Sequence, residues 1–251
     1  MSNNYYAEKG IELSEISHAI DAVWSFEYNH QDSLESFVFP DGSVDIIFQQ
    51  SKGGMQATLC GVMNRTVKLE HHKGHKYYGI RLKPGYASAF FDVSIDGTLN
   101  KTLELNKYFL KQDELLDFLN YDNPDIASFE KVLHEQLLNK VDMQRLKELD
   151  KHIAVMQNVE HGTVSMLASN HQLSRRHFSR CFKEIYGLSP REYTNIQRLN
   201  AFRSMGETFG EISLIDLAFE LGFVDQSHMN RCIKKLSGFT PKELLSQTYN
   251  T

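Results

Sequence analysis

The 251-residue sequence has few cysteines and no long apolar run. Its three cysteines, Cys60, Cys181 and Cys232, lie far apart and form no CxxC or Cys/His zinc spacing, so neither a disulfide framework nor a structural zinc site is indicated. A reducing, cytoplasmic setting fits this pattern. No stretch reaches the ~18 apolar residues of a membrane span, and the first residues lack a basic segment followed by an apolar one. We therefore expect no membrane association and no export.

The common signatures of enzymes are missing as well. The sequence contains no His-x-His pattern with a later His and Glu that could form a metal site, no phosphate-binding loop and no Gly-x-Ser-x-Gly nucleophile elbow. We therefore predict a protein that is not an enzyme, with no catalytic residue, no metal and no cofactor.

Composition and charge indicate two domains with different functions. With 41% apolar and 24% charged residues the chain is typical of a soluble globular protein, and its length suits two modest domains. The net charge of −5 argues, as an average, against a nucleic-acid partner. Residues 1–144, however, hold 13 Lys and Arg against 21 Asp and Glu (net −8), whereas residues 145–251 hold 14 against 11 (net +3). An acidic first part and a basic second part indicate two functions.

Hydrophobic periodicity changes near Pro84. Apolar residues tend to alternate in residues 37–39, 44–48 and 78–82, which are separated by turn residues and are typical of half-buried strands. The spacing becomes helical in residues 86–91, 113–119 and 126–137, and nearly everything beyond reads as helix. We predict an α+β chain of two domains. The first, residues 1–145, is mostly β and ends in helices, and the second, residues 146–251, is all α. The helix at 126–137 is either core or a dimer seam.

An internal repeat lies in the helical part. Residues 173–193 match residues 224–244 at an offset of 51, and Leu167-Ala168 matches Leu217-Ala218 at an offset of 50. The second copy therefore has one more residue in its connecting turn. This pattern predicts two helix-turn-helix units, at about 163–186 and 213–237, joined by a helix that starts at Pro190.

Each copy contains the parts that such a unit needs. Ser174 and Asp225 are N-cap candidates, and Gly187 and Gly238 are C-cap candidates followed by prolines that begin the next helices. One apolar stripe on each second helix is predicted to be core: Phe178, Phe182 and Ile185 in the first copy, and Met229, Ile233 and Leu236 in the second.

The helix face opposite each stripe is polar and basic. Arginine pairs bidentately with guanine, asparagine pairs with adenine, and lysine or serine contacts phosphate, so this face suits a DNA major groove. A solvated charged face is the alternative, but matched Arg and Lys positions in two copies favour DNA. The DNA-binding candidates are Arg175, Arg176, Ser179, Arg180 and Lys183 in the first copy, and Gln226, Ser227, Asn230, Arg231 and Lys234 in the second.

Residues 150–247 resemble the AraC/XylS family of transcription regulators. The tandem units, the Leu-Ala pairs, the stretch ELGFVDQSHMNRCIKKLSGFTPKEL and the linker-like YTNIQRLNAF carry this resemblance. It implies that two recognition helices enter successive major grooves of double-stranded DNA, roughly 34 Å apart, and it implies RNA polymerase as a partner and a location on the bacterial nucleoid in the cytoplasm. It assigns base reading to Arg176, Ser179, Arg180, Gln226, Asn230 and Arg231, and phosphate contacts to Lys183 and Lys234. Met229 and Ile233 stand where the family usually has aromatic residues.

The first half resembles a sensory-type N-terminal domain that precedes this module in some family members. FPDGSVDIIF, the glycine of CGV and YGIRLKPGYASAFF carry the resemblance, which implies a small barrel-like β domain that binds an effector or makes dimer contacts. Asp41, Asp45, Arg81 and Tyr86 are candidate effector-pocket residues, although a turn aspartate, two surface charges and a half-buried tyrosine also explain them. A protein partner instead of a small-molecule effector, and a homodimer, remain open. A cupin-like enzyme with a DNA-binding appendage is disfavoured by the missing signatures.

The cluster of His71, His72 and His75 invites a metal interpretation. Neighbours on a strand point to opposite faces, so His71 and His72 can hardly bind one ion. A solvated hairpin tip with Lys73-Gly74 as its turn is the favoured prediction. Cys181 and Cys232, beside the apolar stripes, are predicted to be small buried apolar residues.

Overall fold

The computed structural model describes residues 5–9, 15–30, 32–51, 54–91, 94–105, 131, 141–156, 164–170, 172–206 and 213–246. The first part is built on an antiparallel sheet whose strands run in the order β1 (Tyr5–Lys9), β2 (Ile20–Glu27), β7 (Lys76–Leu82), β4 (Val44–Ser51), β5 (Gly54–Cys60) and β8 (Thr102–Glu104). A separate two-stranded sheet pairs β3 (Leu34–Val38) with β6 (Val67–His71). The mostly-β first part is therefore confirmed.

Alternation of apolar residues explains the central strands. Ile46 lies opposite Ile80 in the β4–β7 register, and both are fully buried, whereas Ile47 and Gly79 belong to the other face of the sheet. Strand β2 lies outside the stretch that alternation had indicated. Its burial does not alternate, and its register with β7 shifts between Ile20 and Ala22. A strand without alternation is not found by a period-2 search.

Short 3-10 turns lie between strands of the β part. These are η1 (Ser17–Ala19), η2 (Ala87–Ala89) and η3 (Ile95–Thr98). The helical spacing of residues 86–91 thus gives only the single turn η2, which corrects the expectation of an amphipathic helix there. The helices expected at 113–119 and 126–137 lie outside the described residues, apart from residue 131.

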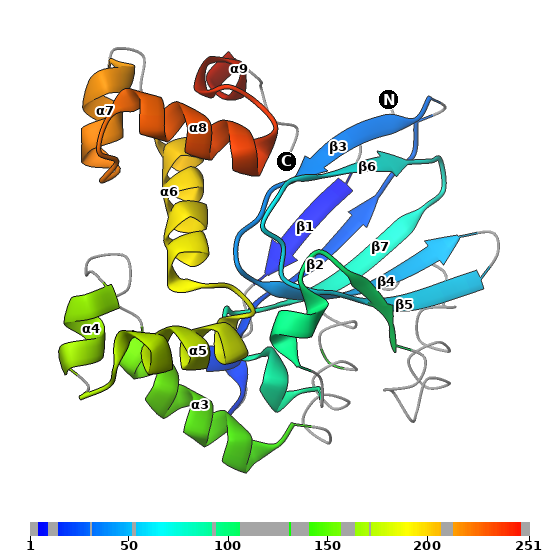
Figure 1. Ribbon diagram of the computed structural model, residues 1–251. Coiled ribbons are helices and arrows are strands. Elements are labelled where there is room, and N and C mark those ends of the chain that lie inside the picture. Colours follow the sequence, from blue (N-terminus) through cyan, green and yellow to red (C-terminus); the bar gives the residue numbers. More distant parts are fainter. Residues whose placement is uncertain are drawn as a thin grey trace.

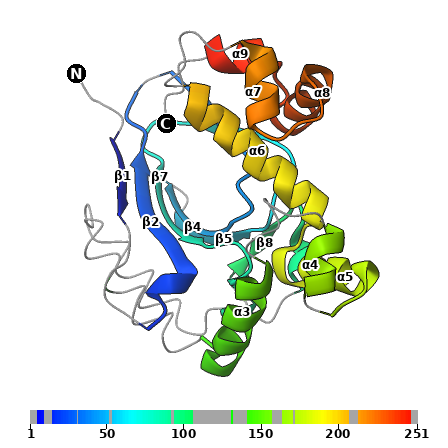
Figure 2. The same cartoon turned by 90° about the vertical axis from the view of Figure 1, so that its left-hand side faces the viewer.

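The second part is helical, as predicted. Its helices are α3 (Met143–Met156), α4 (Val164–Asn170), α5 (Arg175–Tyr186), α6 (Pro190–Gly206), α7 (Leu214–Glu220), α8 (Gln226–Ser237) and α9 (Pro241–Ser246). Figure 1 shows α6 joining the α4–α5 unit at one end to the α7–α8 unit at the other, with the strands to one side. In Figure 2 the six-stranded sheet is strongly curved, and α6 passes across the open side of the curve. Within the described ranges, no helix combines the length and the apolar character that crossing a membrane requires.

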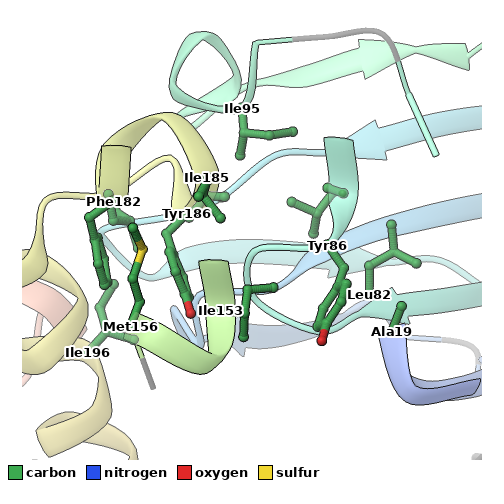
Figure 3. Packing of buried hydrophobic residues seen from close by; sticks show 14 of the residues in the cluster. Ala19, Leu82, Tyr86, Ile95, Ile153, Met156, Phe182, Ile185, Tyr186 and Ile196 are labelled. Atoms are coloured by element: carbon green, nitrogen blue, oxygen red, sulfur yellow. The ribbon is translucent and has the colours of Figure 1, made fainter. Parts of the chain in front are cut away.

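Helix α3 packs between the β part and the first helix-turn-helix unit. Tyr86 donates a hydrogen bond from its hydroxyl to Asp150 Oδ1 of α3 (3.0 Å). On the other side, Ile153 of α3 lies near Ile185 of α5, as a Cβ placed on Gly85 would touch both side chains. Figure 3 shows Tyr86, Ile153 and Ile185 in one cluster of buried apolar residues. The two parts of the chain therefore share buried apolar surface.

Candidate nucleic-acid interface

Helix α5 is delimited by the residues that the sequence indicated. The hydroxyl of Ser174 accepts a hydrogen bond from the backbone N–H of His177 (3.2 Å), which satisfies a free amide of the first turn. Gly187 ends the helix in the left-handed region at φ 71° and donates its N–H to the carbonyl of Lys183 (2.8 Å). Phe178 and Phe182 are fully buried. The predicted caps and core stripe of the first copy are confirmed.

Helix α8 is built in the same way. The carboxylate of Asp225 accepts from the N–H of His228 (2.6 Å), and Gly238 ends the helix at φ 83°. Met229 and Ile233 are fully buried, so the aliphatic side chains fill the core in place of aromatic ones. Both recognition helices consequently turn their second, polar face away from the core.

We call this polar surface of α5 and α8 the reading face; it consists of the DNA-binding candidates other than Arg175. On α5, Arg176, Arg180 and Lys183 are exposed and Ser179 is partly buried. Arg180 lies beside Glu184, with Nε 3.9 Å from Oε1. Arg175 is also exposed but turns back, because its Nε donates to the hydroxyl of Ser165 on α4 (2.9 Å). Arg175 thus braces the unit.

The same face of α8 carries fewer charges. Ser227, Arg231 and Lys234 are exposed, whereas Gln226 and Asn230 are partly buried. Arg180 and Arg231 occupy equivalent positions of the two copies, as do Lys183 and Lys234. Each of the two helices therefore presents an exposed arginine and, about one helical turn further along, an exposed lysine.

Two arginines of α6 pack against aromatic rings. The guanidinium of Arg198 lies 5.0 Å from the ring centre of Phe223, and that of Arg203 lies 4.1 Å from the ring centre of Phe39. These arginines belong to α6, which joins the two units. The arginines of the basic second part are therefore divided between the reading face and the packing of α6.

A loop of the β part contacts the second helix-turn-helix unit and α6, the helix that joins the two units. We call residues 61–66 the docking loop. Thr66 donates two hydrogen bonds to the carbonyl oxygen of Leu236 in the last turn of α8, from its backbone N–H (2.8 Å) and from its hydroxyl (3.0 Å). Asn64 donates from its side-chain amide to Glu192 Oε1 in the first turn of α6 (3.2 Å). Burial opposes ionisation of Glu192, but hydrogen bonds from Ser189 and Asn64 outweigh it and lower its pKa.

Apolar contacts accompany these polar ones. Phe239, directly after the C-cap of α8, meets the ring of Phe37 edge-on, with ring centres 5.0 Å apart. At the C-cap of α5, a Cβ added to Gly187 would lie 3.1 Å from Val62 of the docking loop and 3.0 Å from Ile95. The β part thus holds both recognition helices near their C-terminal ends. Because these partners are far apart in the chain, no local sequence pattern indicates the contacts.

Three of the four effector-pocket candidates come together. Arg81 Nε lies 3.5 Å from Asp41 Oδ2 and 3.5 Å from Asp45 Oδ1. Asp45 also accepts a hydrogen bond from the indole N–H of Trp24 (3.2 Å), and burial raises its pKa to about 6 despite the neighbouring Arg81. Tyr86 lies elsewhere: burial and its hydrogen bond to Asp150 raise its pKa to about 12.

Of the three histidines only His71 belongs to a strand, β6, and not all three are solvated. The turn at Lys73 and Gly74 is confirmed, with Gly74 at φ 82°. His72 is exposed, whereas His71 is buried, hydrogen-bonded to the hydroxyl of Ser36 (2.6 Å), and its pKa is lowered by burial.

This corrects the expectation of a wholly solvated hairpin tip. The strands on either side, β6 and β7, belong to different sheets, so the turn passes from one layer to another. Among the residues that the structure describes, no three His, Cys, Asp or Glu side chains gather to hold a metal ion. Cys232 is buried, as expected, whereas Cys181 is only partly so.

The two parts of the chain match two different domain families. Residues 167–247 match a helix-turn-helix domain family, and residues 14–104 match a domain of unknown function. No curated protein shows a significant match. Solved structures similar to this chain include ToxT from Vibrio cholerae, at 13% identity over 90% of this chain and 98% of that chain, with a TM-score of 0.41. ToxT with a bound unsaturated fatty acid is 15% identical over 98% and 97% of the two chains, with a TM-score of 0.39.

The matched helix-turn-helix family covers both repeat copies, α6 between them and the caps described above. Residues 167–247 are an AraC-type helix-turn-helix domain, and the chain is a DNA-binding transcription regulator.

Proposed function

We propose that the regulator recognises a specific DNA sequence by placing α5 and α8 in successive major grooves. The observation that supports this is the matched exposure of Arg180 and Arg231 on helices whose opposite stripes are buried. An arginine at such a position can form two hydrogen bonds with one guanine, which discriminates it from other bases. Lys183 and Lys234, one turn further along, supply phosphate contacts that fix the register.

The remaining candidates complete the interface. Arg176, Ser179, Gln226 and Asn230 are proposed to contact base edges, and Ser227 to contact phosphate. Arg175 contributes to DNA binding through its hydrogen bond with Ser165, which fixes α5 against α4.

Selection from a random DNA pool by the full-length protein at fixed salt tests this function. The Kd for the selected duplex is then measured for Arg180→Ala and Arg231→Ala. Each change is expected to raise the Kd by the equivalent of ~1 to 3 kcal/mol and to relax the base preference at one position. Lys242→Ala, which removes an exposed charge on α9 outside the reading face, serves as the control. Unchanged sequence preference in both arginine variants would refute the assigned reading face.

We infer that residues 1–145 modulate DNA binding by residues 146–251 through the docking loop. Hydrogen bonds from Thr66 to Leu236 and from Asn64 to Glu192 support this, because they connect the β part with the second unit and with α6, the helix that joins the two units. Displacement of the loop would change the distance and angle between α5 and α8.

The proposed effector site is the cluster of Arg81, Asp41 and Asp45. Its mixed charges, with Trp24 at its edge, suit a polar or acidic small molecule that competes for Arg81. A protein partner that docks on the β part is the second possibility. Shifts of the melting temperature with a metabolite panel favour the first, and capture of a partner from lysate without such shifts favours the second.

The resemblance to the family extends this proposal to partners and location. We infer contacts with RNA polymerase at the promoter, a nucleoid-associated location in the cytoplasm, and a homodimer as one oligomeric state. No catalytic step is assigned to the chain.

A further inference from the structure

The one-residue difference between the two repeat copies is located in the turn of the second copy. In the first copy Leu173 donates its N–H to the carbonyl of Ala168 (2.8 Å) and directly precedes the N-cap Ser174. In the second copy Phe223 makes the equivalent bond to Ala218 (2.8 Å). Phe223 is therefore the counterpart of Leu173.

A left-handed residue precedes each of these anchors: Gln172 at φ 56° in the first copy and Gly222 at φ 72° in the second. The turns thus agree up to the anchor, and they differ directly after it. Val224 stands between Phe223 and the N-cap Asp225, where the first copy has no residue. Val224 is the additional residue of the second unit.

Val224 takes no part in the core. Its side chain is 76% exposed, the highest value among the large apolar side chains of the described residues, whereas Phe223 is buried at 3%. Since Phe223 already anchors the turn, Val224 has no packing role there. The Val224 side chain faces solvent and is therefore accessible to a ligand.

The position of Val224 identifies the ligand. It lies one residue before the N-cap of α8, at the end of the helix that bears Gln226 and Ser227 of the reading face. The N-terminal residues of a recognition helix are the ones that meet base edges in the major groove. The only apolar group on those edges is the 5-methyl of thymine.

We propose that Val224 contacts a thymine methyl in the second half-site and so determines specificity there. This inference rests on the proposed function, because it requires α8 to enter the major groove. It gives the second unit a base contact that the first unit lacks, and it therefore predicts that the two half-sites differ in sequence at the corresponding edge.

Atom-level substitution in the DNA tests the contact. Full-length protein is titrated onto the duplex chosen from a random pool, and each thymine of the half-site bound by α8 is replaced in turn by deoxyuridine, which lacks only the methyl group. This half-site is identified as the one in which base changes raise the Kd of the unchanged protein but not that of Arg231→Ala. We expect one thymine at which the replacement raises the Kd about fourfold, the effect of losing one buried methyl group.

The same replacement is then made with Val224→Ser. This variant should bind the thymine and deoxyuridine duplexes with equal Kd, and its melting temperature should match that of the unchanged protein, because the side chain is exposed. Ile215→Ser, which removes another exposed apolar side chain (54% exposed) from α7, is the matched control and should keep the fourfold effect.

The outcomes separate the two levels of the proposal. If a specific duplex is selected and Arg231→Ala weakens it, but no thymine responds or Val224→Ser keeps the response, the Val224 contact is refuted and the reading face stands. If no specific sequence is selected at all, the proposed function fails and the Val224 contact fails with it.

Discussion

Thr66 and Leu236, 170 positions apart in the chain, are joined by two hydrogen bonds to one carbonyl oxygen, which lies in the last turn of the second recognition helix. The last carbonyls of a helix have no partner within the helix, so an outside donor there stabilises the helix end. The same bonds attach the second helix-turn-helix unit to the β part. One residue of the docking loop thus serves helix capping and attachment together.

Removal of the Thr66 hydroxyl should loosen this attachment. Thr66→Val keeps the shape and the backbone N–H but loses one of the two bonds, and we expect a loss of ~1 kcal/mol in the free energy of unfolding, measured with urea. The variant should also accept a wider range of half-site spacings in a DNA-binding assay, because the second unit is less firmly oriented. Thr66→Ser, which retains the hydroxyl, is the control. Equal spacing preference in all three proteins would contradict the role of the docking loop in modulation.

The two C-cap glycines should respond differently to alanine. Both adopt left-handed backbone conformations, so Gly238→Ala should cost ~1 kcal/mol from backbone strain alone, since nothing lies within 4 Å of the new Cβ. Gly187→Ala places its Cβ 3.0 Å from Ile95 and 3.1 Å from Val62. We expect a larger loss, ~2 to 4 kcal/mol, because crowding adds to the strain. Equal losses in the free energy of unfolding would mean that the β part does not pack closely against the end of α5.

Asp45 should make stability depend on pH. Its pKa of about 6 in the folded chain exceeds the ~3.9 of an unfolded chain. Between these values the folded state holds one more proton than the unfolded state, so stability falls as pH rises from about 4 to about 6 and stays lower above that range. Asp45→Asn should remove this decline, on the order of 2 kcal/mol, from unfolding curves recorded between pH 4 and pH 7.5.

Arg81→Gln provides the reciprocal test of this site. The guanidinium lowers the pKa of Asp45, opposing the effect of burial, so its removal should extend the decline in stability to higher pH. Parallel pH profiles of stability for the unchanged protein and both variants would show that the Asp45 carboxylate is not buried beside Arg81.

DNA affinity should fall steeply with salt. Each phosphate contact releases counterions, so the logarithm of the binding constant falls linearly with the logarithm of the salt concentration. Lys183→Ala and Lys234→Ala should each reduce the slope by about one and weaken all DNA sequences alike. Lys147→Ala, at an exposed position on α3, should leave the slope unchanged. A binding constant independent of salt would exclude phosphate contacts by these lysines.

The sequence alone determined the helix-turn-helix units in detail. Ser174, Asp225, Gly187 and Gly238 cap the helices where they were expected, and the stripes beginning at Phe178 and Met229 are buried. Caps and periodic stripes act over a few residues, so they are legible in a single stretch of chain. The charge difference between the halves likewise pointed to the DNA-binding part although the whole chain is acidic.

The tertiary structure alone decided which of these residues are available and how the parts are connected. It assigned Arg203 to the ring of Phe39, buried His71, separated Tyr86 from Arg81, and exposed Val224 beside the reading face. It also brought Thr66 to Leu236 and Asn64 to Glu192. These relations join residues that are distant in the chain, and they depend on how sheet and helices pack. Local propensity carries no information about such pairs, because their free energy arises only when both partners are already folded.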